Sequence, residues 1–191
     1  MKKLYFFMAF ALCFLLCGCM GYREVNRGYM VTAMGFGAKN DQSTIYIEAL
    51  SASDMSDKKQ ERILLTGVGK SNKQAYQNLK SNLVKPLYFE QLGTVVFEKT
   101  IKPDFKLLGE ITNINPGIYI ALTDDANTLF EGQTPSGVLG YDIITLIKTR
   151  EKETKKHIVN QLYKAQGKTI KLPTVNIFDG NLILKQAEDS K

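Results

Sequence analysis

One cysteine near the N-terminus lies in a sequence that favours covalent attachment of lipid. The basic pair Lys2-Lys3 precedes an apolar run of 13 residues, Leu4–Leu16, and Gly18 and Cys19 follow. Such a run suits a signal peptide, because a membrane-spanning helix needs about 20 apolar residues. A leucine three positions before Cys19 and a glycine directly before it fit the lipobox of bacterial lipoproteins, whose cysteine sulfur receives a diacylglyceryl group. We therefore expect a lipoprotein signal peptide over residues 1–18 and lipidation at Cys19; an ordinary secretory signal or an uncleaved anchor is the alternative.

The other cysteines lie within the predicted signal peptide. The chain has three cysteines, Cys13, Cys17 and Cys19. Cleavage before Cys19 removes the first two, and the lipid occupies the third. The mature protein is then predicted to have no free thiol, no disulfide and no thiolate metal site, so its core must hold it together.

The charge balance is mildly basic. The chain has 25 Lys and Arg against 19 Asp and Glu, and removal of Lys2 and Lys3 leaves 23 against 19, a net charge near +4. The excess is small and is not clustered as in a nucleic-acid binder, so we expect no nucleic-acid partner. It is weakly suited to an anionic membrane surface.

The segment Gly67-Val-Gly-Lys-Ser71 is the strongest enzymatic motif in the chain. It follows a predicted strand and opens a predicted helix, as a phosphate-binding P-loop does. A P-loop also needs a first glycine separated from Gly-Lys-Ser by four residues, and Leu64 stands at that position within the strand. We therefore reject nucleotide hydrolysis.

Other catalytic patterns are incomplete. The single histidine, His157, has no cysteine or second histidine with which to bind zinc, and no nucleophile motif accompanies it. The pair Asp124-Asp125 suits glycosidase or Ca²⁺ chemistry in type, but such a pair before a helix is more often an N-cap. We assign no catalytic, cofactor-binding or metal-binding residue and expect a non-enzymatic binding or structural protein without a cofactor.

Strand and helix patterns interleave along the rest of the chain. We expect a β-hairpin from Gly28–Gly37 and Thr44–Leu50, an exposed loop over Ser51–Glu61, and a third strand, Arg62–Val68. A helix with Ser71 as its N-cap and Ala75, Tyr76, Leu79 and Leu83 on its apolar face follows and ends at Pro86.

The second half repeats this alternation. Predicted strands at Leu92–Phe97 and Ile118–Leu122 flank a helix that begins after Pro103-Asp104. Asp124–Phe130 is a helical turn, and a helix from Val138 runs into the charged stretch Arg150–Lys156. Pro173 precedes a hairpin of Val175–Phe178 and Leu182–Leu184, joined by the turn pair Asp179-Gly180. The pattern predicts one α+β domain, a mixed β-sheet with covering helices.

Several short segments occur in an order that is typical of one protein family. They are Arg23-Glu-Val-Asn26 behind the predicted lipid anchor, Tyr29–Phe36, Gly67–Ser71 with Ala75 and Leu79, Lys85–Leu92, Gly93–Phe97, Leu172-Pro173 and Asp179-Gly180. Together they resemble the Ger(x)C family, the lipoprotein C subunits of spore nutrient germinant receptors. Two segments differ from the family: Glu90-Gln91 replaces its Gly-His pair, and Thr112–Gly117 replaces its Asp-Pro-Glu-(Ile/Leu)-Arg signature.

The resemblance implies that the chain is a membrane-anchored receptor subunit. Members usually continue into a further C-terminal region, so the chain is similar to their N-terminal part. We expect residues 19–27 to form a lipidated N-terminus and short tether, and residues 28–191 the family's N-terminal α+β domain. The resemblance implies integral-membrane A- and B-type receptor subunits as partners, and anchoring through Cys19 at the outer face of the bacterial cytoplasmic (inner spore) membrane. An extracytoplasmic lipoprotein that binds a small ligand for uptake or sensing is the alternative.

Overall fold

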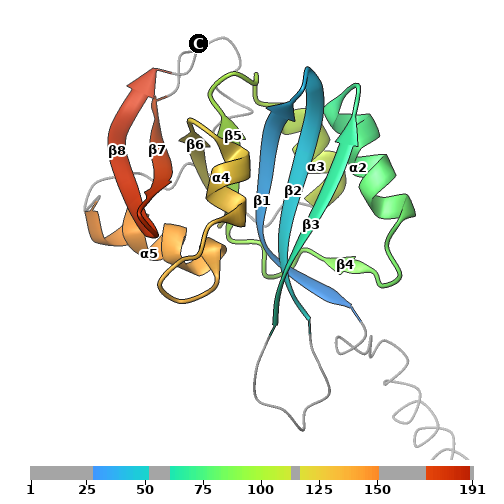
Figure 1. Ribbon diagram of the computed structural model, residues 1–191, viewed down its shortest axis with the longest axis horizontal. Helices are drawn as coiled ribbons and strands as arrows, with labels where there is room; N and C mark the ends of the chain where they lie inside the picture. Colours follow the sequence, from blue (N-terminus) through green and yellow to red (C-terminus); the bar gives the residue numbers. More distant parts are fainter. Residues whose placement is uncertain (1–27, 52–60, 113–116, 151–170, 190–191) are drawn as a thin grey trace, which may run out of the picture.

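A mixed eight-stranded sheet forms the centre of the protein (Figure 1). The computed structural model describes residues 28–51, 61–112, 117–150 and 171–189. The predicted α+β class, a mixed sheet with covering helices, is confirmed. The strands are β1 (Tyr29–Lys39), β2 (Gln42–Ser51), β3 (Glu61–Gly69), β4 (Leu87–Tyr88), β5 (Thr94–Glu98), β6 (Tyr119–Thr123), β7 (Lys171–Phe178) and β8 (Asn181–Asp189). The helices are α2 (Asn72–Ser81), α3 (Phe105–Thr112), α4 (Ala126–Glu131) and α5 (Leu139–Arg150).

The sheet is parallel in its middle and antiparallel at both ends. Its strand order is β3-β2-β1-β5-β6-β7-β8, and β4 pairs with the start of β1. Strands β1, β5, β6 and β7 run parallel, whereas β2, β3 and β8 form antiparallel pairs. Parallel neighbours need long crossover connections, which α3 supplies between β5 and β6 and α4 and α5 supply between β6 and β7.

Helices cover both faces of the sheet, so the molecule has two hydrophobic cores. Figure 1 shows α4 in front of the sheet and α3 behind it. Alternate residues of a strand face opposite sides, which is why consecutive apolar residues such as Val95 and Val96 enter different cores. The first core contains Met34, Phe36, Ile45, Ile47, Val95, Phe97, Ile120, Ala75, Leu79 and Leu108. The second contains Ala33, Tyr46, Val96, Ala121, Leu129, Phe130, Leu139, Ile143 and Val175.

A bulge in β1 brings α5 close to the sheet. The pairing with β2 shifts between Val31 and Ala33, so Val31 faces the first core although Ala33 faces the second. Gly140, in the first turn of α5, packs against the bulged residue, because a Cβ at Gly140 would lie 2.6 Å from the carbonyl oxygen of Thr32. The bulge and the glycine together set the start of α5 against the middle of the sheet.

Local capping residues fix the ends of several elements as predicted. The Ser71 hydroxyl accepts a hydrogen bond from the Gln74 amide and caps α2. The Asp104 carboxylate accepts from the Leu107 amide and performs the same task for α3. Asp179 and Gly180 both have positive φ, 47° and 73°, which matches the two-residue turn predicted between β7 and β8.

Two predictions near prolines are wrong. Helix α2 was predicted to continue to Pro86 but ends at Ser81, and its C-cap Asn82 lies four residues before Pro86. The residues after Pro86 form the short strand β4. Pro173 does not precede the last hairpin but lies inside β7, where the pairing with β8 shifts between Leu172 and Thr174. Because proline cannot donate to the ladder, an irregular position of this kind is where a strand tolerates it. The loop predicted over Ser51–Glu61 falls almost entirely outside the described residues.

Candidate functional site

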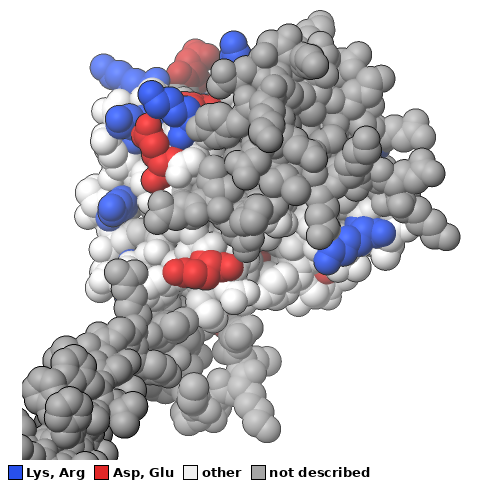
Figure 2. Space-filling view, turned by 180° about the vertical axis from the view of Figure 1, so that it is seen from behind, with Lys and Arg blue, Asp and Glu red and all other residues white. Residues whose placement is uncertain are grey.

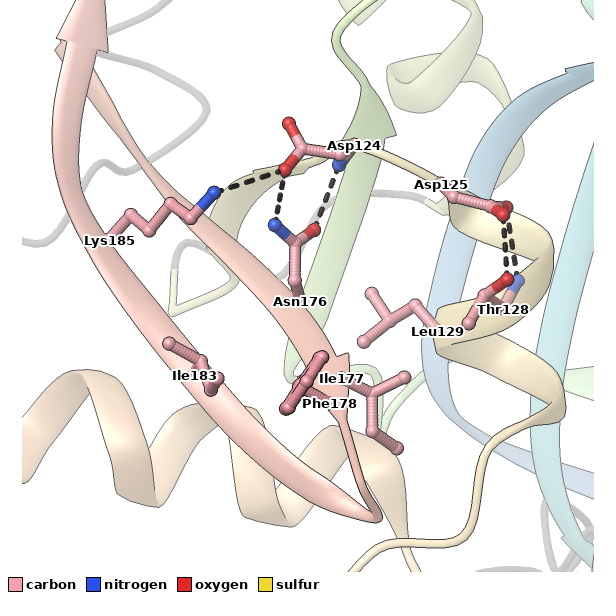
Figure 3. A pocket seen from close by; sticks show the side chains of 9 residues that line it. All are labelled: Asp124, Asp125, Thr128, Leu129, Asn176, Ile177, Phe178, Ile183 and Lys185. Atoms are coloured by element: carbon pink, nitrogen blue, oxygen red, sulfur yellow. Dashed lines mark hydrogen bonds and ion pairs between the residues drawn. The ribbon is translucent and has the colours of Figure 1, made fainter.

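A depression lies between α4 and the β7–β8 hairpin. Figure 3 shows acidic, amide and basic side chains along its upper rim and apolar side chains below them. Its volume is about 310 Å³. The lining residues are Asp124, Asp125, Thr128, Leu129, Asn176, Ile177, Phe178, Ile183 and Lys185.

Asp124 is the centre of the polar rim. Its carboxylate lies 3.0 Å from the Lys99 ammonium and 3.5 Å from that of Lys185, and it accepts a hydrogen bond from the Asn176 amide group. The hydrogen bond from Lys99, followed by that from Asn176, lowers the pKa of Asp124 below its usual value. A carboxylate held ionised in this way is a poor general base.

Asn176 joins two strands that pair over a very short length. Among the described residues, β6 and β7 have a single backbone register pair, Leu122 with Thr174. Two positions further on, the Asn176 side-chain oxygen accepts from the Asp124 amide at 2.9 Å and from the Thr123 hydroxyl at 3.0 Å. The Asn176 side chain therefore extends the connection between these strands.

The neighbouring aspartate has a structural role. Asp125 is the N-cap of α4, and its carboxylate accepts from the Thr128 amide at 3.0 Å and the Thr128 hydroxyl at 2.6 Å. These hydrogen bonds, chiefly the one from the Thr128 side chain, lower the pKa of Asp125. The N-cap interpretation of this acidic pair is thus confirmed for Asp125. No cluster of three or more His, Cys, Asp or Glu residues that could hold a metal occurs within the described ranges.

The lower wall of the depression is apolar and partly open. Leu129 is buried, whereas Phe178 is 66 % exposed and Ile183 is 39 % exposed. The polar atoms of the rim bind mainly one another, and Phe178 and Ile183 below them are open to solvent. The arrangement is chemically suited to contact with another surface and offers no activated acid, base or nucleophile.

The glycine-rich segment before α2 serves packing. A Cβ on Gly67 would overlap the Ala75 carbonyl oxygen and lie 2.5 Å from the Leu79 Cβ, and one on Gly69 would lie 2.6 Å from the Ala75 amide nitrogen. These glycines therefore let α2 lie directly on β3. The amide of Lys70 donates to the Gln74 side chain, and Ser71 caps the helix. The segment Gly67–Ser71 thus contributes to the packing and the capping of α2.

An ion pair between a buried glutamate and a partly buried arginine was not predicted from the sequence. Glu48, on β2, is fully buried, and its two carboxylate oxygens accept from the amides of Leu139 and Gly140 at 2.8 and 3.2 Å. A carboxylate at this place satisfies the free amides at the start of α5 and interacts favourably with the helix dipole. Glu48 thus caps a helix whose first residue, Leu139, lies 91 positions further along the sequence.

Arg62, which is partly buried, completes this ion pair. Its Nε lies 3.7 Å from Glu48, while its two terminal nitrogens donate to the carbonyl oxygens of Gly132 and Phe130 at 2.9 and 2.6 Å. Burial raises the pKa of Glu48 above its usual value, although Arg62 and the two amides of α5 oppose this shift. A glutamate among the inward-facing residues of an apolar strand was the available sequence signal.

Some predicted residues lie outside the described part of the chain. These are Cys19, His157 and most of the charged stretch Arg150–Lys156.

In the described part, Figure 2 shows basic side chains next to acidic ones on the face opposite that of Figure 1. No helix among the described residues is long and apolar enough to cross a membrane.

Comparison with protein-family profiles identifies the chain. Residues 21–177 match the family described as spore germination protein N-terminal domain. The chain belongs to this family. The match starts two residues after Cys19 and ends near the end of β7, so it includes both helix layers and every described strand except β8. No curated protein and no solved structure matches the chain significantly.

The family assignment confirms the resemblance to the Ger(x)C proteins and gives the chain a role in spore germination. The matched region contains Glu48, Arg62, Asp124 and Asn176, the residues that join strands and helices in the described structure. Most of the polar side chains described above therefore belong to the family's N-terminal domain.

Proposed function

We propose that this chain is a membrane-anchored, non-enzymatic lipoprotein subunit of a spore nutrient germinant receptor. The observation that carries the proposal is the family match over residues 21–177, which begins directly behind the lipobox cysteine Cys19. The subunit stabilises or couples integral-membrane A- and B-type subunits from the outer face of the inner spore membrane. Tethering raises the effective concentration of a weak contact surface beside its partners.

The chemistry of the described side chains supports a role without catalysis. Asp124 and Asp125 are bound by neighbouring side chains that lower their pKa values, and Glu48 caps a helix. The depression also supports protein contact better than the alternative, capture of a small ligand. A ligand site presents convergent polar groups to its ligand, whereas Asp124, Asn176 and Lys185 interact with each other.

Anchoring is tested with two neighbouring cysteines. Cys19→Ala removes the sulfur that receives the lipid, so we expect the protein to leave the membrane fraction and the response to nutrient germinants to fall. Cys17→Ala is the matched control, because it changes a residue that leaves with the signal peptide. Membrane fractionation, mass spectrometry of the N-terminal peptide and germination assays provide the measurements. Unchanged partition and unchanged germination in Cys19→Ala spores contradict the proposal.

Receptor membership requires a second measurement. We expect the chain to co-purify from detergent-solubilised spore membranes with two integral-membrane proteins in constant proportion. Deletion of the chain should lower the response to one class of nutrient and leave germination by a receptor-independent stimulus intact. Purification of the lipidated chain without membrane-protein partners, together with normal germination of the deletion strain, contradicts receptor membership.

A further inference from the structure

The end of the domain at which β1 begins has an exposed apolar side chain beside lysines. Val84, in the connection between α2 and β4, is 95 % exposed, the highest value among the large apolar side chains of the described residues. Lys80 is exposed at the end of α2, and Lys85 directly follows Val84. From Asn72 to Phe89 the chain has three lysines and no acidic residue. An exposed apolar residue flanked by cations is the pattern of a contact with an anionic lipid surface.

This connection is attached to the start of β1. The Tyr29 amide donates to the Pro86 carbonyl oxygen at 2.9 Å, and Tyr29 pairs with Leu87 of β4. The Lys85 ammonium lies 5.8 Å from the centre of the Tyr29 ring, within the range of a cation–π interaction. Figure 1 shows β4 beside the beginning of β1, at the end of the molecule opposite the β1–β2 turn. Val84 therefore sits at the place where the chain enters the folded domain.

The length of the preceding chain keeps this end near the membrane. The segment from Cys19 to the residue before Gly28 has nine residues, 19–27. Even when fully extended, a segment of this length spans only about 30 Å. Strand β1, with 11 residues, is about 35 Å long. The β1 start thus remains close to the bilayer, while the β1–β2 turn reaches it only if the domain lies on its side.

We infer that the α2–β4 connection, with Val84 at its tip and Lys80 and Lys85 beside it, rests on the anionic surface of the membrane in which Cys19 is anchored. The inference relies on the proposed lipidation of Cys19. It places the sheet upright, with the β1–β2 turn directed away from the bilayer. The exposed acid Glu61 lies at this same end of the sheet, because Ser51 pairs with both Tyr29 and Glu61. The contact with anionic lipid is therefore assigned to the lysine-bearing α2–β4 connection and not to the start of β3. This orientation leaves the helix layers on both sides of the sheet accessible to receptor partners.

The experiment measures depth in the bilayer from two sites on the full lipidated chain. Val84→Cys and, as control, Gln42→Cys are each labelled with an environment-sensitive fluorophore, and the proteins are reconstituted into phosphatidylglycerol vesicles with lipid-borne quencher. Gln42 is exposed and lies at the opposite end of β1. We expect strong quenching at position 84 and little at position 42. Equal quenching at both positions, or none at position 84 in a vesicle-bound protein, overturns the inference.

A charge variant completes the design. Lys80→Gln combined with Lys85→Gln, in the Val84→Cys protein, should reduce quenching in phosphatidylglycerol vesicles toward the value in phosphatidylcholine vesicles. Lys73→Gln, at the other end of α2, should not. Undiminished quenching in the double variant overturns the assignment to anionic lipid. Flotation of the vesicles distinguishes the two proposals, because a protein that does not float fails the lipid-anchor proposal, whereas one that floats without quenching at position 84 fails only this inference.

Discussion

Glu48 shows how one buried carboxylate joins distant parts of the chain. Its two oxygens accept the free amides at the start of α5, and Arg62 beside it binds two carbonyl oxygens at the end of α4. Removing the Glu48 carboxylate would leave the amides of Leu139 and Gly140 and the Arg62 guanidinium without this partner. Glu48 is therefore a positioning residue for both helices of the second core.

We predict that Glu48→Gln lowers the free energy of unfolding by about 1–3 kcal/mol, because the glutamine side chain has one oxygen where Glu48 has two, so one of the two amide contacts with α5 is lost. Urea unfolding followed by circular dichroism measures the change. Glu61→Gln, an exposed glutamate at the start of β3, is the control and should stay within about 0.5 kcal/mol of the unchanged protein. Equal effects of the two substitutions contradict the assigned role.

The pKa of Glu48 adds a pH signature to the same pair of variants. Since burial raises this pKa in the folded state, the folded protein binds more protons than the unfolded chain between the usual glutamate pKa and the raised one. The stability contributed by Glu48 is therefore greatest below the usual pKa and declines as pH rises through the raised value. Asp124 and Asp125 act in the opposite direction but are present in both proteins. The stability difference between unchanged protein and Glu48→Gln should shrink as pH rises above about 4.5.

Asn176 offers a second test at the residue scale. Asn176→Ala removes the side-chain contacts to Thr123 and Asp124 where β6 and β7 are joined by little backbone pairing. We predict a loss of about 1–3 kcal/mol in unfolding free energy, measured by urea denaturation. Lys185→Ala, which removes only an exposed ion pair with Asp124, should cost at most about 1 kcal/mol. A larger cost for Lys185→Ala than for Asn176→Ala is incompatible with this account.

At the scale of elements, local signals predicted structure well. Ser71 predicted the start of α2, Asp104 that of α3, and Asp179-Gly180 the turn of the last hairpin. Each of these residues binds a nearby backbone amide or adopts the turn conformation itself, so its effect is local in sequence. The ends of elements near Pro86 and Pro173 were wrong, because neighbouring strands decided them: β4 pairs with β1, and an irregular pairing with β8 admits Pro173.

Contacts between residues far apart in the sequence could not be predicted. The contact between Glu48 and the start of α5, and that between Arg62 and the end of α4, depend on which helix covers which face of the sheet. The depression likewise requires β7 to lie beside β6, which no spacing along the chain reveals. The acidic pair Asp124-Asp125 was found, but its division into one ion-paired residue and one N-cap was not.

The packing of α2 on β3 gives a prediction at this scale. Gly67→Ala introduces a methyl group that would overlap the Ala75 carbonyl oxygen and crowd Leu79, so the helix must move outward. We predict a loss of about 1–3 kcal/mol, as for other overpacked sites. Val68→Ala is the control. Val68 lies between the two glycines in the sequence and its side chain is partly exposed, so its truncation should cost less than about 1 kcal/mol. A neutral Gly67→Ala variant would show that the helix does not depend on this close approach.

At the scale of the whole molecule, we expect folding to be separate from the proposed anchoring. The described domain begins at Gly28, and its first strand is held by β2, β4 and β5 and by the Tyr29–Pro86 hydrogen bond. These contacts hold β1 in the sheet from within the described domain. If they suffice for folding, a germination defect of Cys19→Ala spores reflects position in the spore and not unfolding.

We therefore predict that Cys19→Ala leaves the urea midpoint of unfolding unchanged while it abolishes vesicle flotation. Pulse proteolysis measures the midpoint both in solution and on vesicles, so the lipidated and unlipidated proteins are compared by one method. Glu48→Gln is the converse control, because it should lower the midpoint in both forms and leave flotation of the lipidated form intact. A lower midpoint in the Cys19→Ala protein would mean that the bilayer supports the fold. The membrane contact inferred at Val84 is peripheral to the two cores, so it adds orientation and not stability.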